Sequence, residues 1–127
     1  MKKAFLDFIN QLQKKITTSI EDIDSGAKFI EDVWERPEGG GGKSRIMENG
    51  KIFEKAGVNI SAVSGVLPKS LEEYFDVKNT KFFACGLSLV FHPKNPMIPT
   101  VHANFRYFEL YNLDGDLKDQ WFGGGQD

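Results

Sequence analysis

Three polar side chains that can handle carboxylates and protons occur at alternate positions in one otherwise apolar run. They are His102, Asn104 and Arg106. Alternate residues of a β-strand share one face, so a strand here would set the three side chains in a row. Arginine binds carboxylates through paired hydrogen bonds, and histidine titrates near neutral pH. The row therefore predicts a site for a carboxylate-bearing substrate that undergoes proton transfer.

A second strand-like run, residues 82–92, precedes the first and ends in the other histidine of the chain. Within it, Ser88 and His92 share a side with the small residue Gly86. The connector at 92–99 contains three prolines and predicts a stiff loop. If the two runs pair as a hairpin, Ser88 and His92 converge with the polar row on one cleft.

Plainer interpretations stay open for these side chains. A single histidine on a strand is more often a surface or core residue than a catalyst, and Arg106 could form a surface ion pair with Glu109. Two histidines without a second cysteine fall short of the three or four ligands of most closed zinc sites. Cys85 falls on the opposite side of its strand, and we expect a buried small residue there rather than a nucleophile. Ser88 has no nucleophile elbow around it.

The elements that would position the row begin with an amphipathic helix over residues 2–24, where apolar residues recur at steps of three and four. Residues 27–35 predict a strand, and Gly39 to Gly42 follow it. The composition favours a flexible linker at these glycines. The alternative is a ligand-facing loop that aims Lys43, Ser44 and Arg45 at an anion.

The middle of the chain predicts a hairpin at Asn49-Gly50, with a return strand that continues through residues 58–62. In that strand Asn59 and Ser61 share a face, and either meet solvent or line the same cleft as His102.

Two further signals complete the expected fold. Ser70 and Glu73 match a capping box for a short helix that ends at Phe75. Asp114-Gly115 marks a turn, and a strand begins at residues 118–122. A helix followed by strands that turns connect predicts an α+β fold with a largely antiparallel sheet.

Composition narrows the classes of function. A net charge of -2 and a pI near 5.7 give no support for binding nucleic acid. The single cysteine fits a reducing compartment, and no run is long or apolar enough for a signal peptide or a membrane span. We expect a cytoplasmic protein with one domain over residues 1–127. The eleven phenylalanines favour a broad apolar surface or a flat apolar ligand.

Four long motifs, at residues 29–45, 52–61, 92–106 and 121–127, closely resemble the oxygen-dependent coproporphyrinogen III oxidase family. They stand in the family's order and span the whole chain, but only the first part of a typical member. Trp121-Phe122 and the glycines after them look like the approach to another structural feature. We therefore expect the N-terminal part of a longer coproporphyrinogen oxidase domain.

The resemblance implies an oxidoreductase of haem (porphyrin) biosynthesis. Its members oxidatively decarboxylate two propionates of coproporphyrinogen III to vinyl groups and form protoporphyrinogen IX, with O2 as the oxidant. They are homodimers with a flat antiparallel sheet between helices, and they use no organic cofactor. Arg106, Arg45 and Lys43 are available as cationic partners for the carboxylates of such a substrate. With the resemblance, we expect the loop from Gly39 to Gly42 to face the ligand or shape the cleft rather than to act as a linker.

The resemblance also implies roles for individual residues. His102 matches the family's acid/base histidine, and Arg106 and Asp127 match residues that hold propionate and pyrrole nitrogens. Ser88 and the segment Asn104-Phe105-Arg106 match substrate-binding positions. His92 matches a proposed metal ligand of some bacterial members, although a divalent metal requirement is weakly supported.

Two other functions are weighed against this one. The first is a cofactor-independent oxygenase or decarboxylase that acts on another carboxylated aromatic compound. The second is a non-catalytic tetrapyrrole-binding protein. We expect the 127-residue chain alone to be inactive or nearly so, and detectable vinyl product from the purified chain would contradict this expectation.

Overall fold

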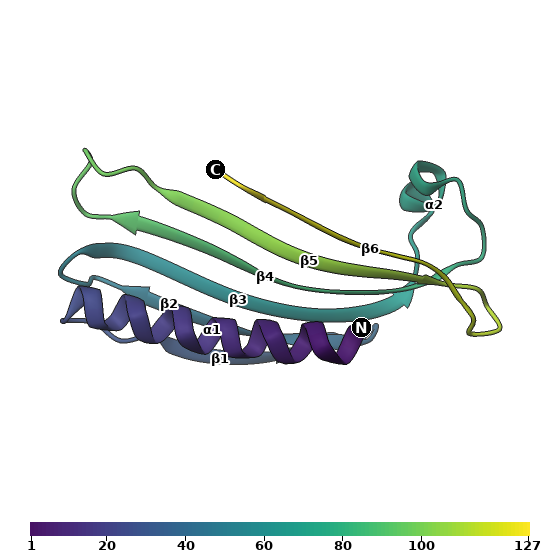
Figure 1. Ribbon diagram of the computed structural model, residues 1–127, viewed down its shortest axis with the longest axis horizontal. Coiled ribbons are helices and arrows are strands. Elements are labelled where there is room, and N and C mark those ends of the chain that lie inside the picture. The colour runs from purple at the N-terminus through teal and green to yellow at the C-terminus, as the bar shows by residue number, and fades with distance from the viewer.

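The computed structural model describes residues 1–127, which form two helices and six strands (Figure 1). In chain order the elements are α1 (Lys2–Asp24), β1 (Ile30–Glu35), β2 (Gly40–Glu48), β3 (Phe53–Val66), α2 (Lys69–Phe75), β4 (Lys81–Pro93), β5 (Val101–Tyr111) and β6 (Leu117–Gln126). The strands form one sheet in the order β1-β2-β3-β4-β5-β6, and every neighbouring pair is antiparallel. The predicted α+β class with an antiparallel sheet is confirmed.

Helix α1 packs along one side of the sheet, as its apolar periodicity predicts. Ile9 is fully buried and forms a core with Val58, Leu87 and Tyr107, which point toward the helix from β3, β4 and β5. We call this side of the sheet the helix face and the other side the open face. In Figure 1, α1 runs across the lower part of the picture, in front of β1 and β2, and α2 lies above one end of the sheet. Neither helix is both long enough and apolar enough to cross a bilayer.

The end of α1 is fixed by one carboxylate. Ser25 adopts a left-handed conformation (φ 58°) that stops the helix, and Asp24 turns back toward the start of β3. The buried Asp24 side chain accepts hydrogen bonds from five backbone N–H groups, those of Gly26, Ala27, Lys51, Ile52 and Phe53. This contact joins the helix to the β2–β3 connection.

The β2–β3 hairpin is confirmed, but its loop is longer than a two-residue turn. Residues 49–52 connect the strands, and Asn49 has a φ of 55°. The sequence signal gave the position of the turn. It did not give the length, because the long-range contact from Asp24 holds residues 51 and 52 out of the strand.

The linker that the composition favoured is wrong, because only Gly39 lies in the turn before β2 and the other three glycines are part of a strand. Gly40 to Gly42 form the start of β2 and pair with residues 61–63 of β3. Close packing explains the glycines, since a Cβ on Gly42 would lie 2.3 Å from Cζ2 of Trp34 and 2.5 Å from the Ile60 carbonyl oxygen.

Three other predictions need correction. Strand β1 begins at Ile30 rather than residue 27. The short helix α2 is confirmed, but its N-cap is Pro68 and no side chain caps it, so the capping box at Ser70 and Glu73 is wrong. Strand β6 continues through residues 123–125 to Gln126, because these glycines pair with β5 instead of ending the strand.

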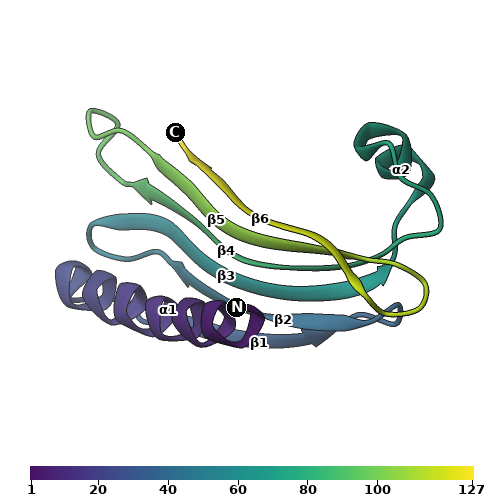
Figure 2. The same cartoon turned by 45° about the vertical axis from the view of Figure 1, so that its right-hand side comes forward.

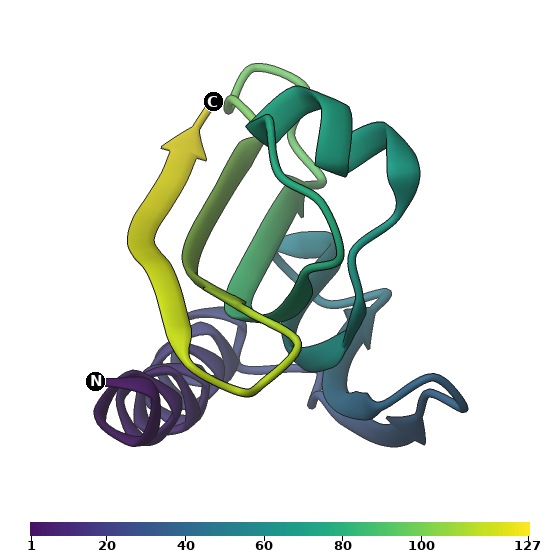
Figure 3. The same ribbon diagram turned by 90° about the vertical axis from the view of Figure 1, so that its right-hand side faces the viewer.

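The open face is concave and only partly covered. The long strands bend away from α1 along their length (Figure 2), and the end-on view shows that they do not lie in one plane (Figure 3). At one end, Phe75 of α2 packs against Phe108 and Trp121, with ring centroids 5.9 and 5.3 Å away. The remainder of the open face carries the polar side chains described next.

Candidate functional site

The strand register sets small and polar residues side by side across the whole open face. One row runs directly across all six strands and contains no large apolar side chain. Its members, each paired with the next, are Asp32, Ser44, Asn59, Ser88, Asn104 and Gly125. Neighbouring strands are about 4.8 Å apart, so this row is a continuous polar strip.

A second row lies beside the first and differs from it by carrying two large side chains. It consists of Trp34, Gly42, Ser61, Gly86, Arg106 and Gly123. Gly42, Ser61 and Gly86 leave the middle of the row without bulk, between an indole on β1 and a guanidinium on β5. Gly86 is necessary here, because a Cβ on it would lie 2.7 Å from the Phe105 carbonyl oxygen and 3.0 Å from the Arg106 Cγ.

His102 lies in a third row, on the other side of the first row from Arg106, and its main chain pairs with that of Asp127. The His102 N–H donates to the Asp127 carbonyl oxygen (2.9 Å), and the Asp127 N–H donates back to the His102 carbonyl oxygen (2.8 Å). The pairing fixes the last residue of the chain beside the histidine. His92 lies next to His102, with their rings edge to face and their centroids 5.9 Å apart.

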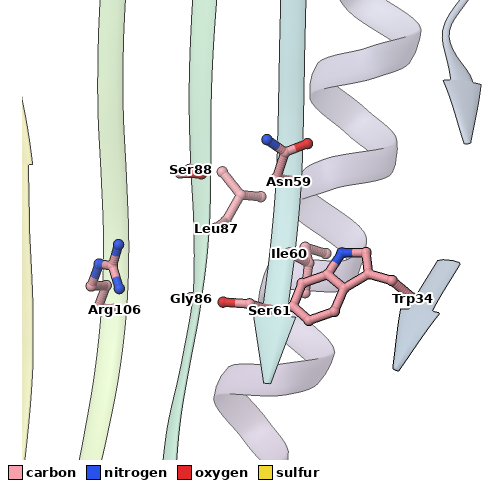
Figure 4. A pocket seen from close by; sticks show the side chains of 8 residues that line it. All are labelled: Trp34, Asn59, Ile60, Ser61, Gly86, Leu87, Ser88 and Arg106. Atoms are coloured by element: carbon pink, nitrogen blue, oxygen red, sulfur yellow. The ribbon is translucent and has the colours of Figure 1, made fainter. Parts of the chain in front are cut away.

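Two adjoining cavities open on this face. The smaller, of about 100 Å³, lies between Trp34, Asn59, Ser61, Gly86, Ser88 and Arg106, as Figure 4 shows. The larger, of about 350 Å³, is lined by Ser88, His102, Asn104, Arg106, Gly125 and Asp127, among others. Ser88 and Arg106 belong to both, so one ligand could reach from one cavity into the other.

Five of the predicted site residues therefore line one cavity. Strand alternation led us to expect four of them, Ser88, His102, Asn104 and Arg106, whereas Asp127 was expected from the family resemblance. His92, which alternation also placed in this cleft, is not among the lining residues. Phe105 does not share their face. It pairs with Leu87, which is part of the core under α1, so its side chain lies on the helix face. Only the main chain of Phe105 is placed to contact a ligand on the open face.

The two cations that follow the glycine segment, Lys43 and Arg45, lie on the helix face and not on the open face with the cavities. Arg45 points to the helix face, where its guanidinium donates to a Glu31 carboxylate oxygen (2.9 Å) and to the Thr17 hydroxyl (3.0 Å). Lys43 shares that face, because it lies two residues from Arg45 on the same strand. Arg106 is therefore the arginine available to a ligand in the two cavities.

The possible ion pair between Arg106 and Glu109 is also excluded by the fold. Glu109 is buried on the helix face, and the hydroxyls of Tyr107 and Tyr111 donate to its carboxylate. Strand alternation alone excludes the pair, because residues 106 and 109 point to opposite sides of a regular strand. The guanidinium of Arg106 makes no salt bridge within the chain.

Cys85 is a core residue, as predicted. It is 3 % exposed, and burial, together with the nearby Glu109 carboxylate, raises the pKa of its thiol to about 11. A thiol with so high a pKa is a poor nucleophile at neutral pH.

A metal at His92 has limited support from the donor set. His92 and His102 are close enough to be neighbours, but no third histidine, cysteine or carboxylate joins them in a ligand cluster. The Nδ1 atom of His92 is instead 3.5 Å from the Thr100 hydroxyl.

Two residues of the smaller cavity were not identified as site residues from the sequence. Trp34 is far from the polar row along the chain, and only the β1–β2–β3 register places its indole there. For Asn59, the sequence allows a position that faces solvent or one that lines the cleft. Its alternation with Ser61 was visible in the sequence, but the pairing of Asn59 with Ser88 was not.

Together these features define an α+β protein with a helix-backed antiparallel sheet, whose concave open face carries a polar strip, an arginine without an ion pair and two adjoining cavities. Comparison with known proteins agrees with this class. The coproporphyrinogen III oxidase family model matches residues 4–127. The chain belongs to the coproporphyrinogen III oxidase family.

Individual relatives show how much of the family the chain covers. Two oxygen-dependent coproporphyrinogen-III oxidases of Prochlorococcus marinus are 50% and 53% identical to it over 92% of its length. Coproporphyrinogen-III oxidase 1, chloroplastic, of Arabidopsis thaliana is 45% identical over 100% of the chain. The chain spans about a third of the length of these curated relatives, 32% to 36%.

Proposed function

We propose that this chain is part of an enzyme that converts two propionates of coproporphyrinogen III to vinyl groups, giving protoporphyrinogen IX in haem biosynthesis. The observation that carries the proposal is the set of five residues around one cavity: Ser88, His102, Asn104, Arg106 and Asp127. The relatives' names support the same reaction.

The reaction requires an electron acceptor and a proton carrier. For each side chain, a propionate, one O2 and one proton become a vinyl group, CO2 and H2O2. The carboxylate leaves as CO2, the side-chain carbon attached to the pyrrole loses one hydrogen, and the two electrons released reduce O2. An electron-rich porphyrinogen can supply those electrons itself, so we propose O2 as co-substrate and no organic cofactor.

Arg106 is proposed to anchor a carboxylate of the substrate. It lies on a rigid strand at the junction of both cavities and makes no ion pair within the chain. A tight ion pair stabilises the ionised carboxylate, which opposes its loss as CO2. Arg106 should therefore contribute mainly to binding, and hence to KM, rather than to kcat.

His102 is proposed to transfer the proton. Its ring is exposed on the open face, and its main chain is fixed by the paired hydrogen bonds with Asp127. Ser88 and Asn104 lie in the next row, directly opposite each other, and can orient the polar groups of the ligand.

The remaining features of the enzyme are proposals from the family and the composition. We propose a homodimer, a cytoplasmic location and no nucleic-acid partner, the last in keeping with the net charge of -2. If a divalent metal takes part, His92 and His102 are the residues that would hold it, with further ligands from outside this chain.

The proposal can be tested in a full-length chimera, a full-length relative in which these 127 residues replace the matching segment. The chimera should form protoporphyrinogen IX in air, and under argon it should bind coproporphyrinogen III without converting it. His102→Ala should lower kcat by about 10²- to 10⁴-fold, the usual contribution of general acid–base catalysis. Binding without conversion in air would instead favour the non-catalytic tetrapyrrole-binding protein.

A further inference from the structure

One buried polar atom on the open face has no partner. The Asn59 Oδ1 atom is shielded from solvent and makes no hydrogen bond within the chain. Buried carbonyl oxygens in folded proteins are nearly always paired. An unpaired one beside a cavity is therefore a candidate for an intermolecular hydrogen bond.

The surroundings of Asn59 indicate what kind of donor would fit. Asn59 borders the smaller cavity, with Ser61 and Trp34 on one side and Ser88 and Arg106 on the other (Figure 4). In Figure 4 the amide nitrogen is on the side of Ser88 and Arg106 and the oxygen points away from them, so a ligand in this cavity reaches the oxygen once the amide group turns. The oxygen can only accept, so the ligand must present an N–H or O–H group to it.

Arg106 sets a second requirement for the same ligand. It lies on β5, two strands from Asn59 on β3, which corresponds to roughly 10 Å across the sheet. A ligand that satisfies both residues carries a carboxylate at one point and a hydrogen-bond donor about that far away.

Trp34 adds an apolar wall to this arrangement. Its indole lies over Gly42, where a Cβ would be only 2.3 Å from Cζ2 of the ring, and it is 36% exposed. An aromatic face at the edge of a strip of small residues suits a flat or shallow ring system. A tetrapyrrole combines rings, pyrrole N–H groups and peripheral carboxylates.

We propose that Asn59 is a substrate-binding residue whose Oδ1 accepts a hydrogen bond from a pyrrole N–H of the tetrapyrrole that Arg106 anchors. This inference rests on the function proposed above. It extends the binding site from the His102 cavity, on β4, β5 and β6, to the smaller cavity that reaches Trp34 on β1.

The test uses Asn59→Leu in the full-length chimera, because leucine keeps the approximate size of the side chain and removes the acceptor. We expect KM for coproporphyrinogen III to rise about tenfold, the effect of losing one hydrogen bond to a buried group, with kcat changed less than about twofold. Anaerobic equilibrium dialysis, read by the fluorescence of the porphyrin after reoxidation, should show the same loss of affinity.

A matched control and a second variant keep the outcomes distinct. Asn10→Leu makes the same chemical change on the exposed side of α1, where Asn10 only donates to the Leu6 carbonyl oxygen, and should leave KM unchanged. Asn59→Ala should also raise KM, and serves if the leucine variant does not fold. If the parent chimera folds but does not convert coproporphyrinogen III, the proposed function fails. If the parent converts it and both Asn59 variants keep the parental KM, the inference about Asn59 is overturned.

Discussion

Gly86 and Arg106 are direct cross-strand partners, and a Cβ on Gly86 would lie 3.0 Å from the Arg106 Cγ. The absence of a side chain at position 86 gives the arginine room over the centre of the sheet. The same glycine lets β4 and β5 approach closely, because a Cβ would also meet the Phe105 carbonyl oxygen at 2.7 Å.

Gly86→Ala should therefore destabilise the 127-residue chain by about 1–3 kcal/mol, the usual range for overpacking, as measured by urea denaturation. Gly123→Ala is the matched control. Gly123 is the partner of Arg106 on the other side, and a Cβ there has no heavy atom within 4 Å. Equal stability losses in the two variants would show that the contact with Arg106 and Phe105 does not explain the glycine at position 86.

The Asp24 carboxylate should make stability depend on acidic pH. Burial of the carboxylate tends to raise its pKa, but hydrogen bonds from the backbone N–H groups of Phe53, Ile52, Lys51 and Ala27 outweigh this and hold the pKa well below its usual value. Because the folded pKa is lower than the unfolded pKa, the stabilisation is complete above about pH 4 and is lost as the pH falls further.

Asp24→Asn should lower the free energy of unfolding at pH 7 by about 2 kcal/mol or more, since hydrogen bonds to charged groups contribute about 1.5–3 kcal/mol. The difference from the parent chain should shrink between pH 4 and pH 2. Asp22→Asn, at an exposed position of the same helix turn, should have little effect. A difference that stays constant down to pH 2 would contradict the role given to the Asp24 charge.

The tyrosines around Glu109 should make stability depend on alkaline pH. The hydrogen bond to Glu109, together with burial, raises the pKa of Tyr111 to about 12. The folded pKa is above the unfolded value of about 10, so this stabilisation is complete below pH 10 and is lost as the pH rises toward 12.

Tyr111→Phe should cost about 1 kcal/mol at pH 8, the typical net value of one hydrogen bond. The difference in free energy of unfolding between the variant and the parent should become smaller from pH 10 to pH 12. A gap that widens over this range would mean that the ionised tyrosine is favoured in the folded chain, contrary to its contact with Glu109.

Local patterns were sufficient for the type and order of the elements and for the polar row, but not for every boundary. The period of α1, the alternation around His102 and the turn at Asp114-Gly115 depend on residues that are close along the chain, and all agree with the structure. The glycines at 40–42 were misjudged because their reason is a neighbour on another strand, the indole of Trp34.

The full set of residues in the candidate site could not be predicted either, because it too depends on neighbours from other strands. Alternation states which residues share a face, but register decides which residues of different strands meet. Asn59 meets Ser88 and Trp34 meets Gly42 only after the strands have paired. Arg45 is the opposite example. Its charge suggested a contact with the ligand, but its side chain lies on the helix face, away from the cavities.

The most direct test of the account compares Arg106→Ala with Arg45→Ala in the full-length chimera. Arg106 borders both cavities on the open face, whereas Arg45 is bound to Glu31 and Thr17 on the helix face. The KM for coproporphyrinogen III should rise about 100-fold in Arg106→Ala, as expected for the loss of about 3 kcal/mol from a charge-assisted hydrogen bond, and should stay near the parental value in Arg45→Ala. An unchanged KM in Arg106→Ala would contradict the assignment of the open face as the substrate site.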